Sequence, residues 1–176
     1  MRMCPIISIV GKSGSGKTTL IEKLIPELKR RGHRIGTIKH AAHGIQVDRE
    51  GKDSWRHRQA GADTVVVATA ETIAMVKNAH GADLDSLTRY FDDVDLVITE
   101  GFKRERRPKI EIFRSGVHDT PLCVDDPDLI AFVTDSTVAP GVPVLGLDDI
   151  EKLADLLEQK FISTRLAQKT GTHPSP

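Results

Sequence analysis

The feature that most constrains the fold is a glycine-rich octapeptide near the N-terminus. Residues 11–18 read Gly-Lys-Ser-Gly-Ser-Gly-Lys-Thr, which satisfies the phosphate-loop pattern G-x-x-x-x-G-K-[ST] at every fixed position. The motif follows an apolar run, Ile6 to Val10, and precedes an amphipathic stretch that begins near Lys17. Glycines let the backbone wrap closely around a phosphate group, so that successive N–H groups and the helix N-terminus face its oxygens. We therefore expect a strand, a phosphate-binding loop and a helix in this order.

Two side chains of the motif and one distant carboxylate carry the expected chemistry. The ammonium of Lys17 is expected to bridge the β- and γ-phosphates, and the hydroxyl of Thr18 to bind Mg²⁺. Such sites use a further carboxylate at the C-terminal end of a neighbouring strand, and Glu100 directly follows the apolar run Leu96 to Thr99. Asp95 precedes that run and would lie about 16 Å away at about 3.3 Å per residue. We expect Lys17 and Glu100 to act in catalysis and Thr18 and Glu100 to hold the metal; the alternative is that Glu100 caps a turn.

The remaining apolar runs alternate with amphipathic segments, which is typical of an α/β domain. We predict the P-loop NTPase fold, in which helices flank a mostly parallel sheet. An antiparallel edge is one possibility, because Thr72 to Val76 either pairs antiparallel with Thr64 to Ala68 or extends the sheet. Pro26 is expected to kink the first helix or to mark an irregular turn. The further strands are predicted over Ile35 to Ile38, Leu96 to Thr99, Ile110 to Phe113, Ile130 to Thr134 and Val144 to Leu147, and the further helices near Ser54 to Ala60, Leu84 to Phe91 and Ile150 to Phe161.

The chain is predicted to form one nucleotide-binding domain over residues 1–161, followed by a disordered tail over residues 162–176. Asp148 and Asp149 are expected to cap the last helix.

The apolar runs are too short for a membrane span, so we expect a cytoplasmic protein. Cys4 and Cys123 belong to no paired pattern, which predicts neither a disulfide framework nor a thiolate zinc site. The 25 basic and 25 acidic residues cancel and aromatic residues make up 4%, which argues against nucleic acid as a partner.

Four further elements accompany the phosphate loop. They are Thr37-Ile38-Lys39-His40, Gly51-Lys52-Asp53-Ser54, Ala60-Gly61-Ala62 and Thr99-Glu100-Gly101-Phe102-Lys103. In this order they resemble the molybdopterin-guanine dinucleotide biosynthesis protein B family, and the similarity covers roughly residues 5 to 160. The resemblance implies a GTP-binding homodimer that uses Mg²⁺, hydrolyses GTP slowly and assists a separate guanylyltransferase, the enzyme that joins GMP to the pterin cofactor. Molybdopterin is a further candidate partner.

The resemblance also implies roles for individual residues. The residues that would line the loop near the terminal phosphate are Lys39, His40, Asp48, Lys52 and Asp53. The residues that would hold the phosphates are Gly11, Ser13, Gly14, Ser15, Gly16, Lys17, Thr18 and Thr19.

Lys12 departs from the family pattern, in which an uncharged residue is common at this position. Its setting, Gly-Lys-x-Gly-x-Gly-Lys-Thr-Thr, is similar to the deviant phosphate loops of dimeric ATPases, where this second lysine reaches the partner's nucleotide. We therefore hypothesise that Lys12 acts in catalysis across a dimer, as an arginine finger does; the alternative is a solvated loop lysine.

Base recognition has no familiar signal, because the sequence contains no Asn-Lys-x-Asp element. Asp135 lies just beyond the strand Ile130 to Val133 and is our candidate to accept two hydrogen bonds from guanine; the alternative is a turn aspartate that bonds its own backbone.

The run Lys103 to Lys109 holds five positive charges against one negative. It either binds an anion, such as a pterin phosphate or an acidic partner surface, or is solvated. Two other functions stay open, a small-molecule kinase and a metal-insertion GTPase, of which the second is disfavoured by the missing thiolate cluster.

Overall fold

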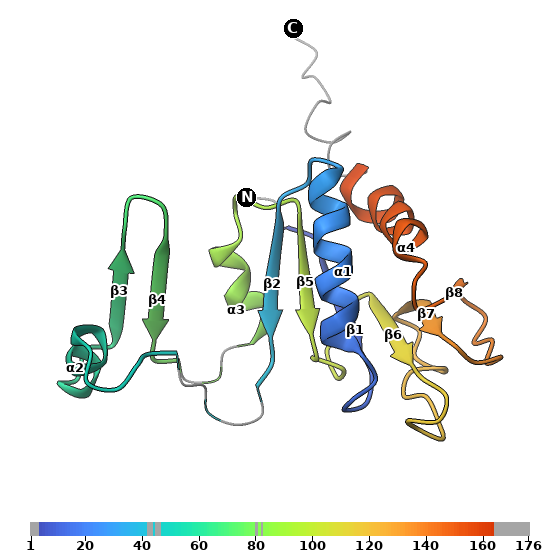
Figure 1. Ribbon diagram of the computed structural model, residues 1–176, viewed down its shortest axis with the longest axis horizontal. Coiled ribbons are helices and arrows are strands. Elements are labelled where there is room, and N and C mark those ends of the chain that lie inside the picture. Colours follow the sequence, from blue (N-terminus) through green and yellow to red (C-terminus); the bar gives the residue numbers. More distant parts are fainter. Residues whose placement is uncertain (1–3, 42–43, 45–46, 80, 82, 164–176) are drawn as a thin grey trace, which may run out of the picture. The chain divides into compact units, whose positions relative to one another are not determined.

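The computed structural model describes residues 4–41, 44, 47–79, 81 and 83–163 (Figure 1). The chain divides into two compact units. The first comprises Met1–His40 and Thr88–Pro176, and the second comprises Ala41–Leu87. Most of the tail that the sequence predicts to be disordered, from residue 164 onward, lies outside the described residues. Among the helices of the described part, none is long and apolar enough to cross a membrane.

A six-stranded parallel sheet forms the centre of the first unit. The strands follow the order β2-β5-β1-β6-β7-β8, and every neighbouring pair is parallel. Their bounds are β1 Ile6–Val10, β2 Ile35–Lys39, β5 Leu96–Glu100, β6 Lys109–Phe113, β7 Leu129–Thr134 and β8 Val144–Leu145. The predicted mostly parallel α/β fold is thereby confirmed. From β1 the chain first forms strands on one side, β2 and β5, and then strands on the other side, β6 to β8. The carboxyl end of β1 therefore lies at the topological switch point, where parallel sheets bind ligands.

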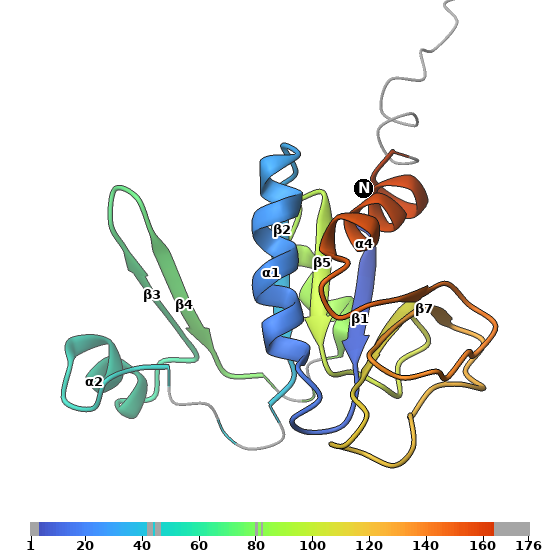
Figure 2. The same ribbon diagram turned by 45° about the vertical axis from the view of Figure 1, so that its right-hand side comes forward.

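One face of the sheet is covered by α1, Lys17–Arg30, and by α4, Ile150–Leu157, which continues as the π-helical turn η2, Glu158–Ile162. The two helices lie side by side on this face (Figure 2). The leucines of α1 recur every fourth residue, so one stripe of the helix is buried against the sheet. The buried residues of this core include Ile7, Ile9, Leu20, Leu24, Leu28, Ile98, Ile110, Val133, Leu153 and Leu157.

Helix α1 continues without interruption through Pro26, so the predicted irregular turn does not form. Proline removes the hydrogen bond to the carbonyl four residues earlier, here that of Glu22. Both Pro26 and Glu22 are exposed, so water can satisfy that carbonyl.

The opposite face of the sheet carries a second apolar cluster. Phe113 and Phe132 stack there at 6.1 Å between ring centroids, within a cluster completed by Val10, Cys123 and Leu129. On β2, a Cβ atom at Gly36 would lie 2.4 Å from the ring of Phe91, so only glycine fits. Phe91 therefore packs on the sheet after the short helix η1, Thr88–Tyr90. This contact explains why the helix predicted over Leu84 to Phe91 is shorter than expected, with α3 limited to Leu84–Leu87.

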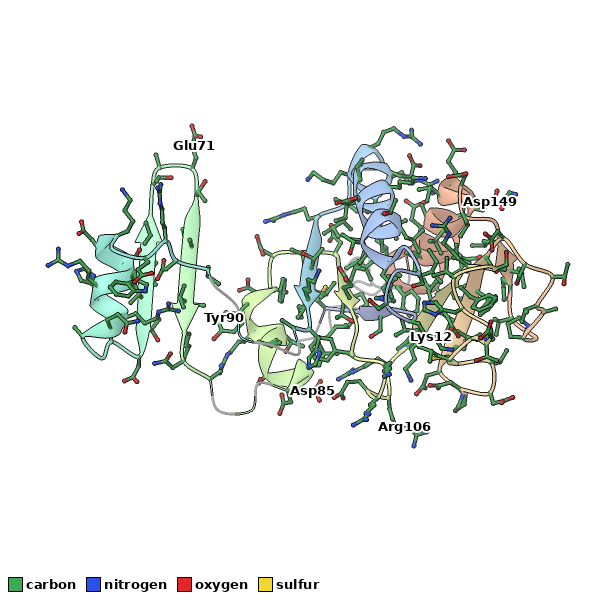
Figure 3. The ribbon with its side chains drawn as sticks, turned by 60° about the horizontal axis from the view of Figure 1, so that its bottom comes forward. Lys12, Glu71, Asp85, Tyr90, Arg106 and Asp149 are labelled. Carbon is green, nitrogen blue, oxygen red and sulfur yellow. The ribbon has the colours of Figure 1, made fainter. Side chains whose placement is uncertain are left out.

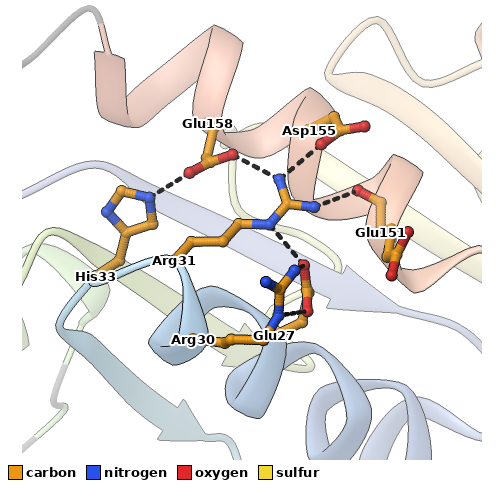
Figure 4. Close-up of polar contacts among 7 residues, drawn as sticks. All are labelled: Glu27, Arg30, Arg31, His33, Glu151, Asp155 and Glu158. Carbon is orange, nitrogen blue, oxygen red and sulfur yellow. Dashed lines mark hydrogen bonds and ion pairs between the residues drawn. The ribbon is translucent and has the colours of Figure 1, made fainter.

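An ion-pair network joins the end of α1 to α4 and η2 (Figure 4). Arg31 donates from Nε to Glu27 Oε1 at 2.6 Å, and from Nη1 to Asp155 Oδ1 at 2.6 Å and Glu158 Oε2 at 2.5 Å. Its Nη2 donates to the carbonyl oxygen of Glu151 at 3.1 Å. One guanidinium thus holds the C-terminal end of α1 against the last helical segment.

The predicted cap of the last helix is wrong in its detail. Asp149 occupies the N-cap position of α4 (Figure 3), but its carboxylate makes no capping bond to the helix. Its Oδ2 instead accepts from the backbone N of Gly146 at 2.8 Å, and its Oδ1 accepts from Lys152 at 2.9 Å. The bond to Gly146 closes a turn directly after β8, which is why that strand ends earlier than predicted.

The second unit contains α2, Asp53–Gln59, a hairpin of β3, Thr64–Ala68, and β4, Ile73–Lys77, and α3. Of the two pairings left open by the sequence, the antiparallel one is found, and the hairpin forms a separate two-stranded sheet. Helix α2 contacts β3.

Candidate nucleotide-binding site

The glycine-rich motif forms the loop between β1 and α1, as predicted. Gly11, Gly14 and Gly16 all have positive φ angles, which side chains rarely adopt. At Gly11 the constraint is also steric, because a Cβ atom there would lie 2.5 Å from the carbonyl oxygen of Ile112. The loop therefore starts in direct contact with β6, and α1 begins at Lys17.

Lys17 curls back over the loop that precedes it. Its Nζ donates to the carbonyl oxygens of Gly11 at 3.0 Å and Lys12 at 2.8 Å. Burial lowers the pKa of the Lys17 ammonium, and the nearby Glu100 carboxylate partly offsets this by raising it. The cation lies where a bound anion would meet it.

Thr18 and Glu100 meet although 82 positions separate them. The hydroxyl of Thr18 donates to Glu100 Oε2 at 3.1 Å, and Lys39 Nζ lies 3.4 Å from Glu100 Oε1. The contact arises because Glu100 is the last residue of β5, which is adjacent to β1. A hydroxyl and a carboxylate oxygen are donors that suit Mg²⁺, which is commonly held by one or two protein oxygens together with phosphates. The residues present therefore fit this ion.

A second test of the site comes from Ser15. The side chain of Ser15 is fully buried, and within the described residues its Oγ has no hydrogen-bond partner. An unpaired buried hydroxyl costs free energy unless a ligand or water satisfies it. Ser15 Oγ lies beside Gly11, 2.6 Å from the place where a Cβ atom of that residue would stand. A phosphate oxygen or a water molecule that reached it would supply the missing partner.

His40 lies at the β5 side of the loop. Its backbone N donates to the carbonyl oxygen of Glu100 at 3.0 Å, and its ring meets Phe102 edge-on at 5.0 Å. Phe102 has a φ of 53°, a value that is strained for a side chain of this size. These residues line a cavity of about 470 Å³ together with Val10, Gly11, Gly101, Lys103, Arg104 and Glu105.

The other predicted residues near the terminal phosphate belong to the second unit. Asp48 accepts from Ser54 Oγ at 3.1 Å, Lys52 precedes α2, and Asp53 begins that helix. Lys39 and His40 belong to the first unit. The role of Asp48, Lys52 and Asp53 at the phosphate stays a prediction.

Lys12, on the loop that precedes α1 (Figure 3), contacts a residue of its own chain. Its Nζ donates to Thr120 Oγ1 at 3.1 Å. The same segment supplies His118, whose Nε2 donates to the carbonyl oxygen of Ser13 at 2.7 Å. Residues 114–123 therefore brace the tip of the phosphate loop.

The bracing segment is held at both ends. Near its start, Asp135 Oδ1 accepts from the backbone N of Ser115 at 2.7 Å and from its Oγ at 3.0 Å, and the first of these bonds lowers the pKa of Asp135. Near its end, Glu111 is 1% exposed and accepts from the backbone N atoms of Leu122 at 2.6 Å and Cys123 at 2.7 Å. Burial, reinforced by Glu111, raises the pKa of the Cys123 thiol to about 11, so this cysteine is unreactive at neutral pH.

A phosphate loop at the carboxyl end of β1, set in a mostly parallel sheet, is the arrangement of the P-loop NTPase type of fold. The family model described as "Molybdopterin guanine dinucleotide synthesis protein B" matches residues 6–135, and the chain belongs to this family. The resemblance inferred from the sequence motifs is thereby confirmed.

Individual relatives agree with this assignment. The molybdopterin-guanine dinucleotide biosynthesis adapter protein of Haemophilus influenzae is 43% identical over 157 residues, which are 88% of either chain. Its counterpart in Escherichia coli is 40% identical and covers 88% of this chain and 92% of the relative. A solved structure of molybdopterin-guanine biosynthesis protein B superimposes with a TM-score of 0.71 at 33% identity, covering 88% of this chain and 97% of that one. The structure of the Bacillus subtilis protein gives a TM-score of 0.70 at 28% identity, covering 89% and 98%.

Proposed function

We propose that this protein is a GTP-binding adapter of molybdopterin guanine dinucleotide biosynthesis, which assists a separate guanylyltransferase. The relatives' names support the pathway. The observation that supports nucleotide binding is the meeting of Lys17, Thr18 and Glu100 at the glycine-rich loop.

In this proposal the loop N–H groups and Lys17 hold the β- and γ-phosphates, while Thr18 and Glu100 hold Mg²⁺. When bound, the ion neutralises charge on the phosphate oxygens. With the ion bound, Glu100 would be occupied as a ligand of the metal and by Lys39, so it would be poorly placed to take a proton from an attacking water. Slow hydrolysis follows, which suits an adapter that acts by complex formation. A kinase is less well supported, because residues 103–108 form turns that lead into β6 and not a helical lid.

The basic run that begins at Lys103 borders the cavity beside His40 and Phe102. Its cations Lys103 and Arg104 are exposed and flank an aromatic wall. We place an anionic partner at this edge, either the pterin phosphate or an acidic surface of the guanylyltransferase.

We further propose that the protein is a homodimer whose contact includes the hairpin. Directly opposed residues share a face of an antiparallel pair, so Val66 lies with Met75 and Ala68 with Ile73. This face is apolar and open, with Ile73 74% exposed, while Val65 on the other face is buried. A two-stranded sheet is only marginally stable by itself in water, and it gains stability when its exposed apolar face is covered by a second copy of the chain. For Lys12 to act on a partner's nucleotide, it would first have to leave Thr120.

The dimer is tested by light scattering on the purified protein. Ile73→Asp is expected to yield monomers, whereas Glu71→Ala, in the hairpin turn, is expected to leave the dimer intact. A wild-type monomer at micromolar concentration would contradict this part of the proposal.

The function is tested by reconstituting guanylyl transfer from a purified guanylyltransferase, molybdopterin and GTP with Mg²⁺. Addition of this protein is expected to increase the yield of the dinucleotide, and Lys17→Ala is expected to remove the increase together with GTP binding. Exposed Lys29 lies near the other end of α1, and Lys29→Ala serves as the matched control. No effect of the wild-type protein on transfer, combined with no calorimetric signal for GTP, would refute the proposal.

A further inference from the structure

A second cavity, of about 210 Å³, borders the other side of the phosphate loop. The cavity near His40 is bounded by residues that follow β5, whereas this one is bounded by the ends of β6 and β8 and the first turns of α1. In the sheet, β5 and β6 lie on opposite sides of β1. Its lining residues are Ser15, Gly16, Thr19, Leu20, Lys23, Ile112, Arg114, Leu147 and Asp148.

The contact between Thr18 and Glu100 sets the direction in which a nucleotide can lie. This pair marks the β5 side of the loop as the metal side. A metal ion held by Thr18 and Glu100 would neutralise charge on the terminal phosphates, so the terminal phosphate would face β5. The nucleoside must then leave the loop on the opposite side, toward β6 and β8. Thr19, the residue after Thr18, lines the cavity on that side, and so does Ser15.

The chemistry of the cavity suits a flat heteroaromatic ring. Leu20 and Ile112 are buried and, with Leu147, supply apolar surface. Lys23 and Arg114 add cations, which interact favourably with aromatic faces. Pockets that enclose a whole drug-sized ligand measure about 300–1,000 Å³. The smaller volume here therefore fits one base of a nucleotide whose phosphates lie outside it.

Two acids follow strands at this edge of the sheet, and the structure separates their roles. Asp135 does not line the cavity, and its Oδ1 accepts two bonds from Ser115, one of them from the backbone, which fixes this carboxylate in the bracing segment. Asp148 lines the cavity, and its side chain is 87% exposed. Its Oδ1 lies 2.7 Å from the Nζ of Lys23, a flexible side chain that is itself 47% exposed and can move aside for a ligand. The turn that carries Asp148 is held by the bond from the backbone N of Gly146 to Asp149. Asp148 is thus a carboxylate presented to the cavity by an ordered turn.

We propose that this cavity takes the base of the nucleotide and that Asp148 selects guanine. Guanine offers two neighbouring donors, N1–H and the 2-amino group, which the two oxygens of one carboxylate can accept. Adenine presents an acceptor at N1, which a carboxylate repels. Guanine thus gives the carboxylate two donors, whereas adenine places an acceptor against it, so the cavity favours guanine. The inference rests on the proposed nucleotide-binding function and assigns its base specificity to a residue that sequence reasoning considered only as a helix cap.

The test is calorimetric titration of wild type and Asp148→Asn with GTP, ATP and xanthosine triphosphate in the presence of Mg²⁺. An amide in place of the carboxylate offers a donor to the 2-oxo group of xanthine and one acceptor fewer to guanine. Asp148→Asn is therefore expected to bind GTP about 10- to 100-fold more weakly and to gain affinity for xanthosine triphosphate. Inorganic tripolyphosphate, which lacks a base, is expected to bind both proteins equally.

Two further variants complete the test. Asp135→Asn is expected to keep the ratio of GTP to ATP affinity, and Asp125→Asn, an exposed acid outside the lining of either cavity, serves as the matched control. The inference would be overturned if Asp148→Asn kept the wild-type ratio of GTP to ATP affinity, or if Asp135→Asn lost that ratio. Neither outcome would count against the phosphate site. Failure of wild type to bind either tripolyphosphate or GTP would instead refute the proposed function itself. Asp148 forms only an exposed ion pair with Lys23, so its substitution is expected to leave the melting temperature within about 2 °C of wild type.

Discussion

Arg31 is expected to be a major single contributor to the stability of the first unit. Its side chain is 16% exposed and bonds three carboxylates and one carbonyl oxygen across α1, α4 and η2. Exposed ion pairs are worth about 0.2–1 kcal/mol, and breaking fully buried ones costs about 3–5 kcal/mol. The partly buried network lies between these limits, so Arg31→Ala should reduce the free energy of unfolding by about 2 kcal/mol. For a chain of this size the melting temperature should fall by about 4–8 °C.

The assay is urea unfolding followed by circular dichroism, with a thermal scan as a check. Arg31→Lys keeps the charge but lacks the fork that reaches several acceptors at once, so about half of the loss is expected. Exposed Lys29→Ala, two residues away, controls for loss of charge alone. Helix α1 spans about 20 Å, so the affinity for GTP at its other end should stay within about twofold of wild type. If Arg31→Ala unfolded within about 1 °C of wild type, the network would be shown to contribute nothing, and this reasoning would be refuted.

Three further outcomes are expected. Hydrogen bonds from Arg30 and Arg31 lower the pKa of Glu27 to about 2, and bonds from His33 and Arg31 lower the pKa of Glu158. The stabilisation that these two carboxylates provide is complete above their usual pKa of 4.5 and is lost as the pH falls toward their pKa values in the folded protein. Urea unfolding at a series of pH values from 6 to about 2 should therefore show a steady decline in the free energy of unfolding. His118→Ala should weaken GTP binding about fivefold, because the carbonyl oxygen of Ser13 in the phosphate loop loses its hydrogen-bond donor. His118→Gln retains an N–H group and should keep most of the affinity. Equal losses of affinity in the two variants would contradict the bracing role of His118. Glu111→Gln should destabilise the protein by about 1–2 kcal/mol in unfolding measurements, since an amide has only one oxygen for two backbone donors, and a wild-type stability would argue that the buried carboxylate is dispensable.

The sheet could be predicted from the sequence because buried parallel strands are short continuous apolar runs. The predicted bounds of Ile6–Val10 match the structure, and Leu96–Glu100 and Leu129–Thr134 each extend the prediction by one residue. Helix ends were less predictable, because they depend on contacts made far along the chain. Phe91 illustrates this, since its ring packs against a glycine of β2 and not along its own helix.

The phosphate site could be predicted in part for a similar reason. Residues at the carboxyl ends of adjacent parallel strands meet at one edge, so the contact between Thr18 and Glu100 follows from strand order. The bracing residues His118 and Thr120 could not be found this way. They lie on an irregular segment whose path is set by Glu111 and Asp135, and neither periodicity nor spacing signals such a path.

The hydrogen bond between Thr18 and Glu100 has a consequence for how the protein meets its cation. Both oxygens are already held within reach of each other while the polypeptide is alone. An incoming divalent ion would exchange one weak protein contact for coordination, with little rearrangement of either backbone segment. Binding sites whose ligating side chains are flexible lose affinity because those side chains must be immobilised when the ion binds. This loss is small here, because folding of the chain already brings the two ligating side chains together.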